Sequence, residues 1–263
     1  MARPFLKWAG GKTKLVEDIV THMRSKPLGI RWTVRQDLGD KRYIEPFVGG
    51  AGAYLGLWRH GMIDAEKTIL ADINEVLIVT LSAIADEGTK EDVIRVLSDM
   101  ETEFENDPAG YYYERRGYLN KSIIPSPGKD RVETAAHMIF INKTCFNGLW
   151  RVNSRGEMNT PLGRSPSGKT QILDKGGLME FGSAVNGAEL LHQGWRETMK
   201  SAGEGDLVYV DPPYWPTQGE YVFRDYSKDG FLDSEQIEVA KLCAEAAARG
   251  ARVIISNNYS ESI

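Results

Sequence analysis

The chain has 263 residues, and its hydrophobic fraction of 41% and charged fraction of 26% are typical of a folded globular protein rather than a disordered one. No apolar run approaches the roughly 18 residues that a membrane-spanning helix needs, and the N-terminus has no signal-peptide hydrophobic region. The two cysteines and four histidines have no zinc-ligand spacing, so we expect reduced thiols and no metal site.

The net charge of −5 argues against a protein that is basic over its whole surface. The charge is unevenly distributed, however, because residues 111–175 contain eleven Lys and Arg against five Asp and Glu. A basic middle between acidic flanks predicts one face that binds a polyanion. The alternative is a solvated charged surface without a partner.

The first motif, at residues 5–12, reads Phe-Leu-Lys-Trp-Ala-Gly-Gly-Lys, and a helical pattern of apolar residues follows it. A Gly-Gly turn that opens a helix exposes backbone N–H groups, which attract anions. Lys12 adds a positive charge and Trp8 a flat apolar surface, so a ligand with a carboxylate and an aromatic ring fits here. The alternative is a capped surface helix.

A strand is expected over residues 43–47, followed by a Gly-rich turn over 48–53 and a short helix over 53–59. A second strand over 68–71 ends at Asp72. This order is the first half of a nucleotide-binding βαβ unit, in which an acidic residue about 20 positions after the turn binds ribose hydroxyls. Asp72 can also serve as a helix N-cap.

The apolar spacing predicts helices over residues 77–85, 93–104 and 132–140. The next segment, 141–164, has Asn-Gly and Arg-Gly turns that indicate a β-hairpin. Its Arg and Asn side chains are of the types that read base edges in DNA. The aromatic residues Phe146 and Trp150 are candidates for wedging between bases or stacking on them. The basic residues Lys143, Arg155 and Arg164 are candidates for phosphate contacts. The alternative is a purely structural hairpin.

Strands are expected over residues 189–192 and 207–210, and the second ends in Asp211-Pro212-Pro213-Tyr214. The two prolines prevent the chain from continuing in the sheet, which leaves a stiff corner. A carboxylate and a backbone carbonyl there can accept hydrogen bonds from an exocyclic amine, while the tyrosine stacks on its ring. This corner indicates methylation of an amine, or else a proline-stiffened turn of another α/β enzyme.

The chain continues with a long polar segment over residues 217–230, for which we expect a mobile lid beside the site. A helix that ends at Gly250 and a strand over 252–256 follow.

Five motifs, in this order, resemble those of Dam-type class D12 DNA adenine-N6 methyltransferases. They are Phe-Leu-Lys-Trp-Ala-Gly-Gly-Lys at 5–12, Glu-Pro-Phe-Val-Gly-Gly at 45–50, Ala-Asp-Ile-Asn at 71–74, Phe-Asn-Gly-Leu at 146–149 with Arg-Gly-Glu at 155–157, and Asp-Pro-Pro-Tyr at 211–214. The resemblance implies an α/β fold with a doubly wound, Rossmann-like sheet. It also implies a mostly helical target-recognition insertion that contains a β-hairpin.

The resemblance further implies S-adenosylmethionine as methyl donor, double-stranded DNA as substrate and GATC as the candidate target. It divides the chain into a catalytic domain over residues 1–80 and 186–263 and a recognition insertion over 81–185. Its donor-binding positions are Trp8, Lys12, Phe47, Gly49, Asp72 and Asp211. Its catalytic positions are Asp211, Pro212, Pro213 and Tyr214. Its DNA-binding positions are Lys143, Phe146, Asn147, Leu149, Arg151 and Pro161. We expect a monomer in the cytoplasm of a bacterial or phage-infected cell.

The chain departs from the family in its length, because it ends seven residues after the last expected strand. We therefore expect the C-terminal strands of the family sheet to be missing. Two alternatives remain open at this point. One is a truncated, catalytically impaired DNA-binding relative, and the other is methylation of another amine, such as RNA adenine or cytosine N4.

Overall fold

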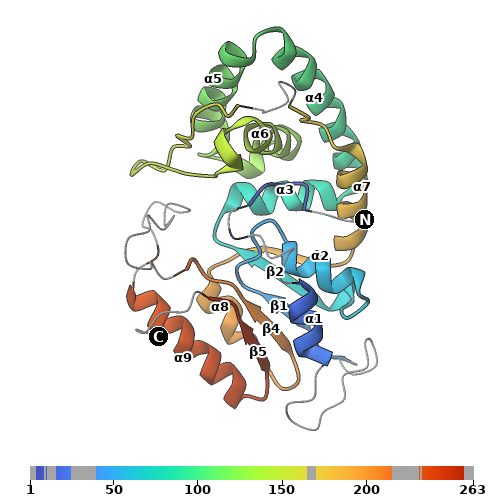
Figure 1. Cartoon of the computed structure of the whole chain (residues 1–263), viewed down its shortest axis with the longest axis vertical. Coiled ribbons are helices and arrows are strands. Elements are labelled where there is room, and N and C mark those ends of the chain that lie inside the picture. The colour runs from blue at the N-terminus through green and yellow to red at the C-terminus, as the bar shows by residue number, and fades with distance from the viewer. Residues whose placement is uncertain are drawn as a thin grey trace.

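A computed structural model describes residues 4–8, 10, 16–24, 40–164, 170–214, 231 and 233–257. Within these ranges the centre of the molecule is a five-stranded parallel sheet with the strand order β3-β2-β1-β4-β5 (Figure 1). The strands are β1 (Tyr43–Glu45), β2 (Thr68–Asp72), β3 (Glu189–His192), β4 (Leu207–Val210) and β5 (Arg252–Ile255). This order and the flanking helices confirm the predicted α/β fold with a doubly wound sheet.

Helices connect the strands and form a separate layer at one end of the molecule. The longer helices are α1 (Val16–Arg24), α2 (Gly52–Arg59), α3 (Glu75–Ala85), α4 (Glu87–Asn106), α5 (Pro108–Tyr118), α6 (Arg131–Thr144), α7 (Lys175–Val185), α8 (Trp195–Lys200) and α9 (Asp233–Ala248). The short helical turns are η2 (Ala65–Lys67), η3 (Leu119–Ile123), η4 (Pro127–Lys129) and η5 (Phe146–Gly148). Side-chain oxygens accept backbone N–H bonds at five helix starts, as N-caps do: Asn74, Asp86, Asp107, Asp130 and Asp174.

The central strands bury both of their faces, because successive side chains point to opposite sides of the sheet. In β4, Leu207 and Tyr209 belong to the hydrophobic cluster that includes α2 and α3. Val208 and Val210 belong to the cluster that includes α8 and α9. The predicted strand over 43–47 ends earlier, at Glu45, because Pro46 follows and has no N–H group for the ladder.

Helices α4, α5 and α6 lie beyond α3, away from the sheet (top of Figure 1). One hydrophobic cluster extends from Leu70 in the sheet through Leu77 of α3 to Phe140 of α6. Of the two domain boundaries expected from the sequence, that at 80–81 lies inside α3, and that at 185–186 coincides with the end of α7. The helical layer is thus packed onto the sheet through α3.

Candidate functional site

The carboxyl ends of β1, β2 and β4 meet at one edge of the sheet. Strand β1 lies between β2 and β4 and pairs with both. From β1 the chain builds the sheet in one direction through β2 and β3 and then in the other through β4 and β5, so the direction reverses between β1 and β4. Ligands of doubly wound sheets bind at such a switch point. Phe47 and Asp211 follow β1 and β4, and Asp72 is the last residue of β2, so the structure brings three of the expected site residues to this edge.

The Asp72 carboxylate holds the loop that follows β1. Its Oδ2 atom accepts a hydrogen bond from the Gly49 N–H at 3.1 Å, and its Oδ1 atom accepts one from the Asn74 N–H at 2.9 Å. Burial raises the pKa of Asp72, although these N–H groups oppose the change. The N-cap of α3 is Asn74, whose Oδ1 accepts from the Leu77 N–H at 3.1 Å, so the alternative that Asp72 caps this helix is wrong.

Trp8 packs on the Gly-rich turn after β1. A Cβ atom added to Gly49 would lie 2.6 Å from Cδ1 of the Trp8 indole, and Gly49 has a φ of +47°, so glycine is required there for two reasons. Trp8, Gly49 and Asp72 are therefore connected in space. Lys12, the other donor-binding residue expected in the N-terminal motif, lies outside the described residues.

Phe47 belongs to an aromatic cluster at the same edge. Its ring stacks on Trp195, with centroids 5.9 Å apart and planes inclined by 26°, and it meets Phe231 edge-on at 6.1 Å. Trp195 and Phe231 were not among the residues expected in the site. Neither has a motif around it, and only their aromatic character gave a signal.

The Asp211–Tyr214 corner follows β4 directly, as the sequence predicts. Asp211 is half-buried. Burial of Tyr209 raises the pKa of its hydroxyl, and the neighbouring Asp211 carboxylate raises it further. Two elements brace the corner from outside. The Gln236 amide nitrogen in α9 donates to the Pro213 carbonyl oxygen, and the Tyr214 hydroxyl lies 3.4 Å from Ser256 Oγ at the end of β5.

The segment after α6 forms an irregular hairpin, which projects to the left in Figure 1. It contains two isolated antiparallel bridges instead of a regular ladder, between Cys145 and Leu162 and between Val152 and Met158. A further backbone hydrogen bond connects the two arms of the hairpin, from the Phe146 N–H to the Pro161 carbonyl at 2.9 Å. We call residues 144–163 the recognition hairpin.

All six residues expected to bind DNA lie on or next to the recognition hairpin. Phe146, Asn147 and Pro161 are exposed, and Leu149, Arg151 and Lys143 are half-buried. Arg151 is oriented by Asn159, whose Oδ1 accepts from Nε of Arg151 at 2.7 Å. Burial lowers the pKa of Lys143, and Lys7 contributes in the same direction.

Trp150 was a candidate for wedging or stacking, and this is wrong because the side chain is only 5% exposed and belongs to the hydrophobic core. Arg155, a candidate for a phosphate contact, forms an ion pair with Glu157 at 2.7 Å at the tip of the hairpin.

Helix α5 and the turn η3 support the recognition hairpin through three side chains. The Tyr112 hydroxyl and Arg116 Nη1 both donate to the Thr160 carbonyl at 2.8 Å. The Asn120 amide forms two bonds with the Met158 backbone, at 2.7 and 3.0 Å. This support of the hairpin was not expected from the sequence, although the spacing of four positions between these residues marks one helix face.

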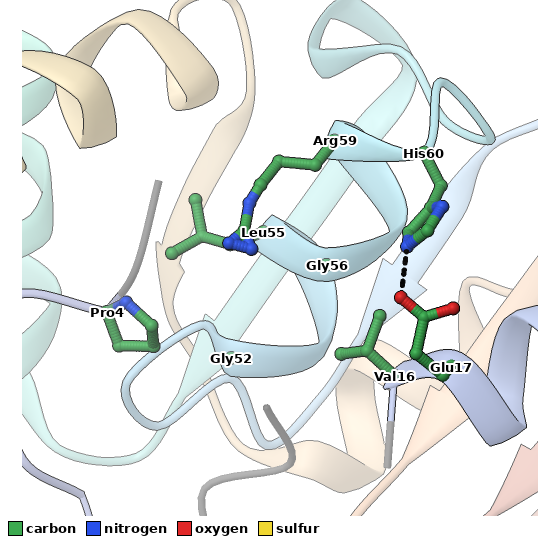
Figure 2. Close-up of a pocket in the computed structure, with 8 residues that line it drawn as sticks. All are labelled: Pro4, Val16, Glu17, Gly52, Leu55, Gly56, Arg59 and His60. Carbon is green, nitrogen blue, oxygen red and sulfur yellow. Dashed lines mark hydrogen bonds and ion pairs between the residues drawn. The ribbon is translucent and has the colours of Figure 1, made fainter. Parts of the chain in front are cut away.

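A small pocket lies between α1 and α2 (Figure 2). Glu17 and His60 approach each other to 3.1 Å at one side of it. Its volume is about 60 Å³, whereas sites for drug-sized ligands enclose roughly 300 Å³ or more. None of Phe47, Asp72 and Asp211 lines it, so it is separate from the edge of the sheet described above.

Within the described ranges the structure has neither a membrane-spanning helix nor a metal-binding cluster. No helix there is long and apolar enough to cross a bilayer. In the same part of the chain, no three His, Cys, Asp or Glu side chains gather in a way that would hold a metal ion. Cys145 and Cys243 are both buried and form no disulfide.

Comparison with known proteins assigns the chain to a family. The model of the D12 class N6 adenine-specific DNA methyltransferases matches residues 8–263. The type II methyltransferase M.MjaIII of Methanocaldococcus jannaschii is 33% identical over 262 residues, which are 98% of this chain and 85% of that protein. The DNA adenine methylase of Escherichia coli is 33% identical over 258 residues (97% and 81%), and that of Serratia marcescens 33% over 260 residues (98% and 84%). The chain therefore belongs to the D12 class of N6 adenine-specific DNA methyltransferases, a family whose members use a methyl donor and act on DNA.

Proposed function

We propose that this protein transfers a methyl group from S-adenosylmethionine to N6 of a flipped-out adenine in double-stranded DNA. The observation that supports the proposal most strongly is the position of the Asp211–Tyr214 corner. It follows β4 at the switch point of the sheet, beside the ends of β1 and β2. We further propose GATC as the first target to test and a monomer as the active form.

The residues at the edge of the sheet fit the proposed donor. The Asp72 carboxylate has lone pairs beyond the two that accept backbone N–H bonds, and these suit the ribose hydroxyls. Trp8, Phe47 and Gly49 line the neighbouring turn, and Lys12 and Asp211 complete the proposed set. When bound, S-adenosylmethionine supplies an electrophilic methyl group on a sulfonium.

The corner would act on the amino group of the target base. An adenine inside a duplex cannot reach it, so the base must first leave the stack. The Asp211 carboxylate and the Pro212 carbonyl then accept the two N6 hydrogens, which draws the nitrogen lone pair out of the ring. Tyr214 stacks on the base, and Pro213 holds the corner rigid. The lone pair would form the new N–C bond as the bond between the methyl carbon and the sulfonium sulfur breaks, with S-adenosylhomocysteine as the leaving group. The methylated amino group would then lose one proton to solvent. Acceptors placed in advance where positive charge develops lower the barrier.

DNA recognition is assigned in this proposal to the insertion over residues 81–185. Phe146, Asn147 and Pro161 present an exposed surface at one end of the recognition hairpin. Arg151 keeps its terminal nitrogens available for a base edge, since the bond from its side chain to Asn159 uses Nε. Leu149 and Lys143 lie beside this surface and would provide an apolar contact and a positive charge.

The test uses the full chain, labelled S-adenosylmethionine, two DNA duplexes that differ only in whether they contain GATC, and an RNA of the same sequence. Hydrolysis of the product to nucleosides separates N6-methyladenine from N4-methylcytosine. Label in N6-methyladenine supports the proposal, and a preference for the GATC duplex supports that target. Label in cytosine alone, label only in RNA, or binding of duplex without any transfer would contradict it.

A further inference from the structure

One buried amide side chain joins two segments that lie far apart in the sequence. Asn142 is in the last turn of α6 and is 1% exposed. Its Oδ1 atom accepts from the Lys7 N–H at 2.8 Å, and its Nδ2 atom donates to the Lys7 carbonyl at 2.7 Å. The same nitrogen donates to the Gly148 carbonyl at 3.0 Å. Both amide hydrogens and the amide oxygen therefore form bonds to these two segments.

The two segments belong to different parts of the proposed site. Lys7 directly precedes Trp8, which packs on Gly49, and the Gly49 N–H is bonded to Asp72. Gly148 lies in the recognition hairpin. A continuous chain of contacts thus runs from the proposed donor-binding residues through Asn142 to the proposed DNA-reading residues.

The two segments also touch each other directly. Gly148 has a φ of +66°, and a Cβ atom added to it would lie only 2.4 Å from the Lys7 Cβ atom. Such close packing leaves little room for one segment to shift independently of the other. Breaking the Asn142 bonds would leave buried polar groups without partners, so the arrangement resists separation.

We propose that Asn142 is a positioning residue that couples binding of the methyl donor to binding of target DNA. This inference rests on the proposed function. Ordering of the segment at residues 5–8 by the donor would order the recognition hairpin through Asn142, and DNA on the hairpin would order residues 5–8. Such coupling is reciprocal, so each ligand raises the affinity for the other by the same factor.

The experiment measures the dissociation constant of S-adenosylhomocysteine, an unreactive mimic of the donor, with and without a saturating GATC duplex. The ratio of the two constants is the coupling factor. In Asn142→Leu, which keeps the side-chain size but has no amide, we expect this factor to fall at least about fivefold towards one. The control is Thr80→Val, because Thr80 is also fully buried and its hydroxyl donates to the Val76 carbonyl of its own helix, α3. That variant should keep the wild-type factor.

The outcomes separate this inference from the proposed function. A wild-type protein that binds neither ligand contradicts the proposed function. A wild-type factor of one, or an unchanged factor in Asn142→Leu, overturns the coupling role alone. If Asn142→Leu does not fold, amide hydrogen exchange of the wild type decides. The duplex alone should then slow exchange at Lys7, and the donor mimic alone should slow it at Gly148 and Leu149, whereas no effect at either place overturns the inference.

Discussion

The Gln236 amide nitrogen donates a hydrogen bond to the Pro213 carbonyl oxygen, and this bond connects the first turn of α9 to the corner that follows β4. The Asn257 amide in turn donates to the Gln236 Oε1 atom at 3.3 Å. Three separate stretches of the chain therefore meet behind Pro213. The corner is rigid because of its prolines and because a side chain on another element holds its carbonyl in one direction.

Gln236→Met should lower kcat for methyl transfer. The methionine has a similar length but cannot donate to Pro213, so the corner is less well oriented, and we expect kcat to fall by about tenfold or more. The KM values for donor and DNA should change by less than about twofold. Steady-state kinetics checks this, with Glu245→Met on the exposed side of α9 as control. Equal kcat values for Gln236→Met and the control would show that the bond is only structural.

Asn120→Ala should weaken DNA binding more than it weakens the binding of donor alone. Asn120 forms two bonds with the Met158 backbone, so its loss should loosen the recognition hairpin. With each bond contributing about 1 kcal/mol, we expect the Kd for duplex DNA to rise by roughly tenfold to thirtyfold. Titration of labelled duplex measures this change, and Ser122→Ala, at an exposed neighbouring position, is the control. Unchanged affinity in Asn120→Ala would argue that the hairpin is held by other contacts.

His137 should make the free energy of unfolding depend on pH. The ring is fully buried in α6, with its Nδ1 atom 2.9 Å from the Glu133 carbonyl oxygen and 3.3 Å from the Glu133 carboxylate. The Tyr118 ring and the Arg115 guanidinium of α5 also lie near it. Burial lowers the pKa of His137 to about 4, from its usual value of 6.5.

Between pH 6.5 and 4 the unfolded chain would carry a proton on this histidine while the folded protein would not. The His137 contribution to stability is therefore complete above pH 6.5 and is lost as the pH falls towards 4, by up to about 3 kcal/mol. Urea unfolding at several pH values should show this slope in the wild type and a shallower one in His137→Leu. Parallel slopes in the two proteins would contradict the assignment.

Much of the fold and the sheet edge could be predicted because the signals are local. Asp72 and Asp211 each end an apolar run, so their positions at strand ends follow from periodicity and from the prolines after Asp211. The shorter β1 shows a limit of this reasoning, since apolar character continues to Phe47 although Pro46 ends the ladder.

Contacts between distant parts of the chain could not be predicted in the same way. Asn142 looks like an ordinary polar residue near a helix end, and its partner Lys7 is 135 positions away. Trp150 has the same aromatic character as Phe146, but one is in the core and the other is 50% exposed. In a regular β-ladder, side chains alternate between the two faces, and this alternation would have distinguished the buried residue from the exposed one. The hairpin has only two isolated bridges instead of such a ladder.

The most direct test of the account is methyl transfer by Asp211→Ala in the full chain. The carboxylate is proposed to accept an N6 hydrogen of the target adenine, so its removal should reduce transfer to duplex DNA by about a thousandfold or more. Duplex affinity and the thermal unfolding midpoint should stay close to those of the wild type. A folded Asp211→Ala protein that methylates adenine within about tenfold of the wild-type rate would contradict the proposed mechanism.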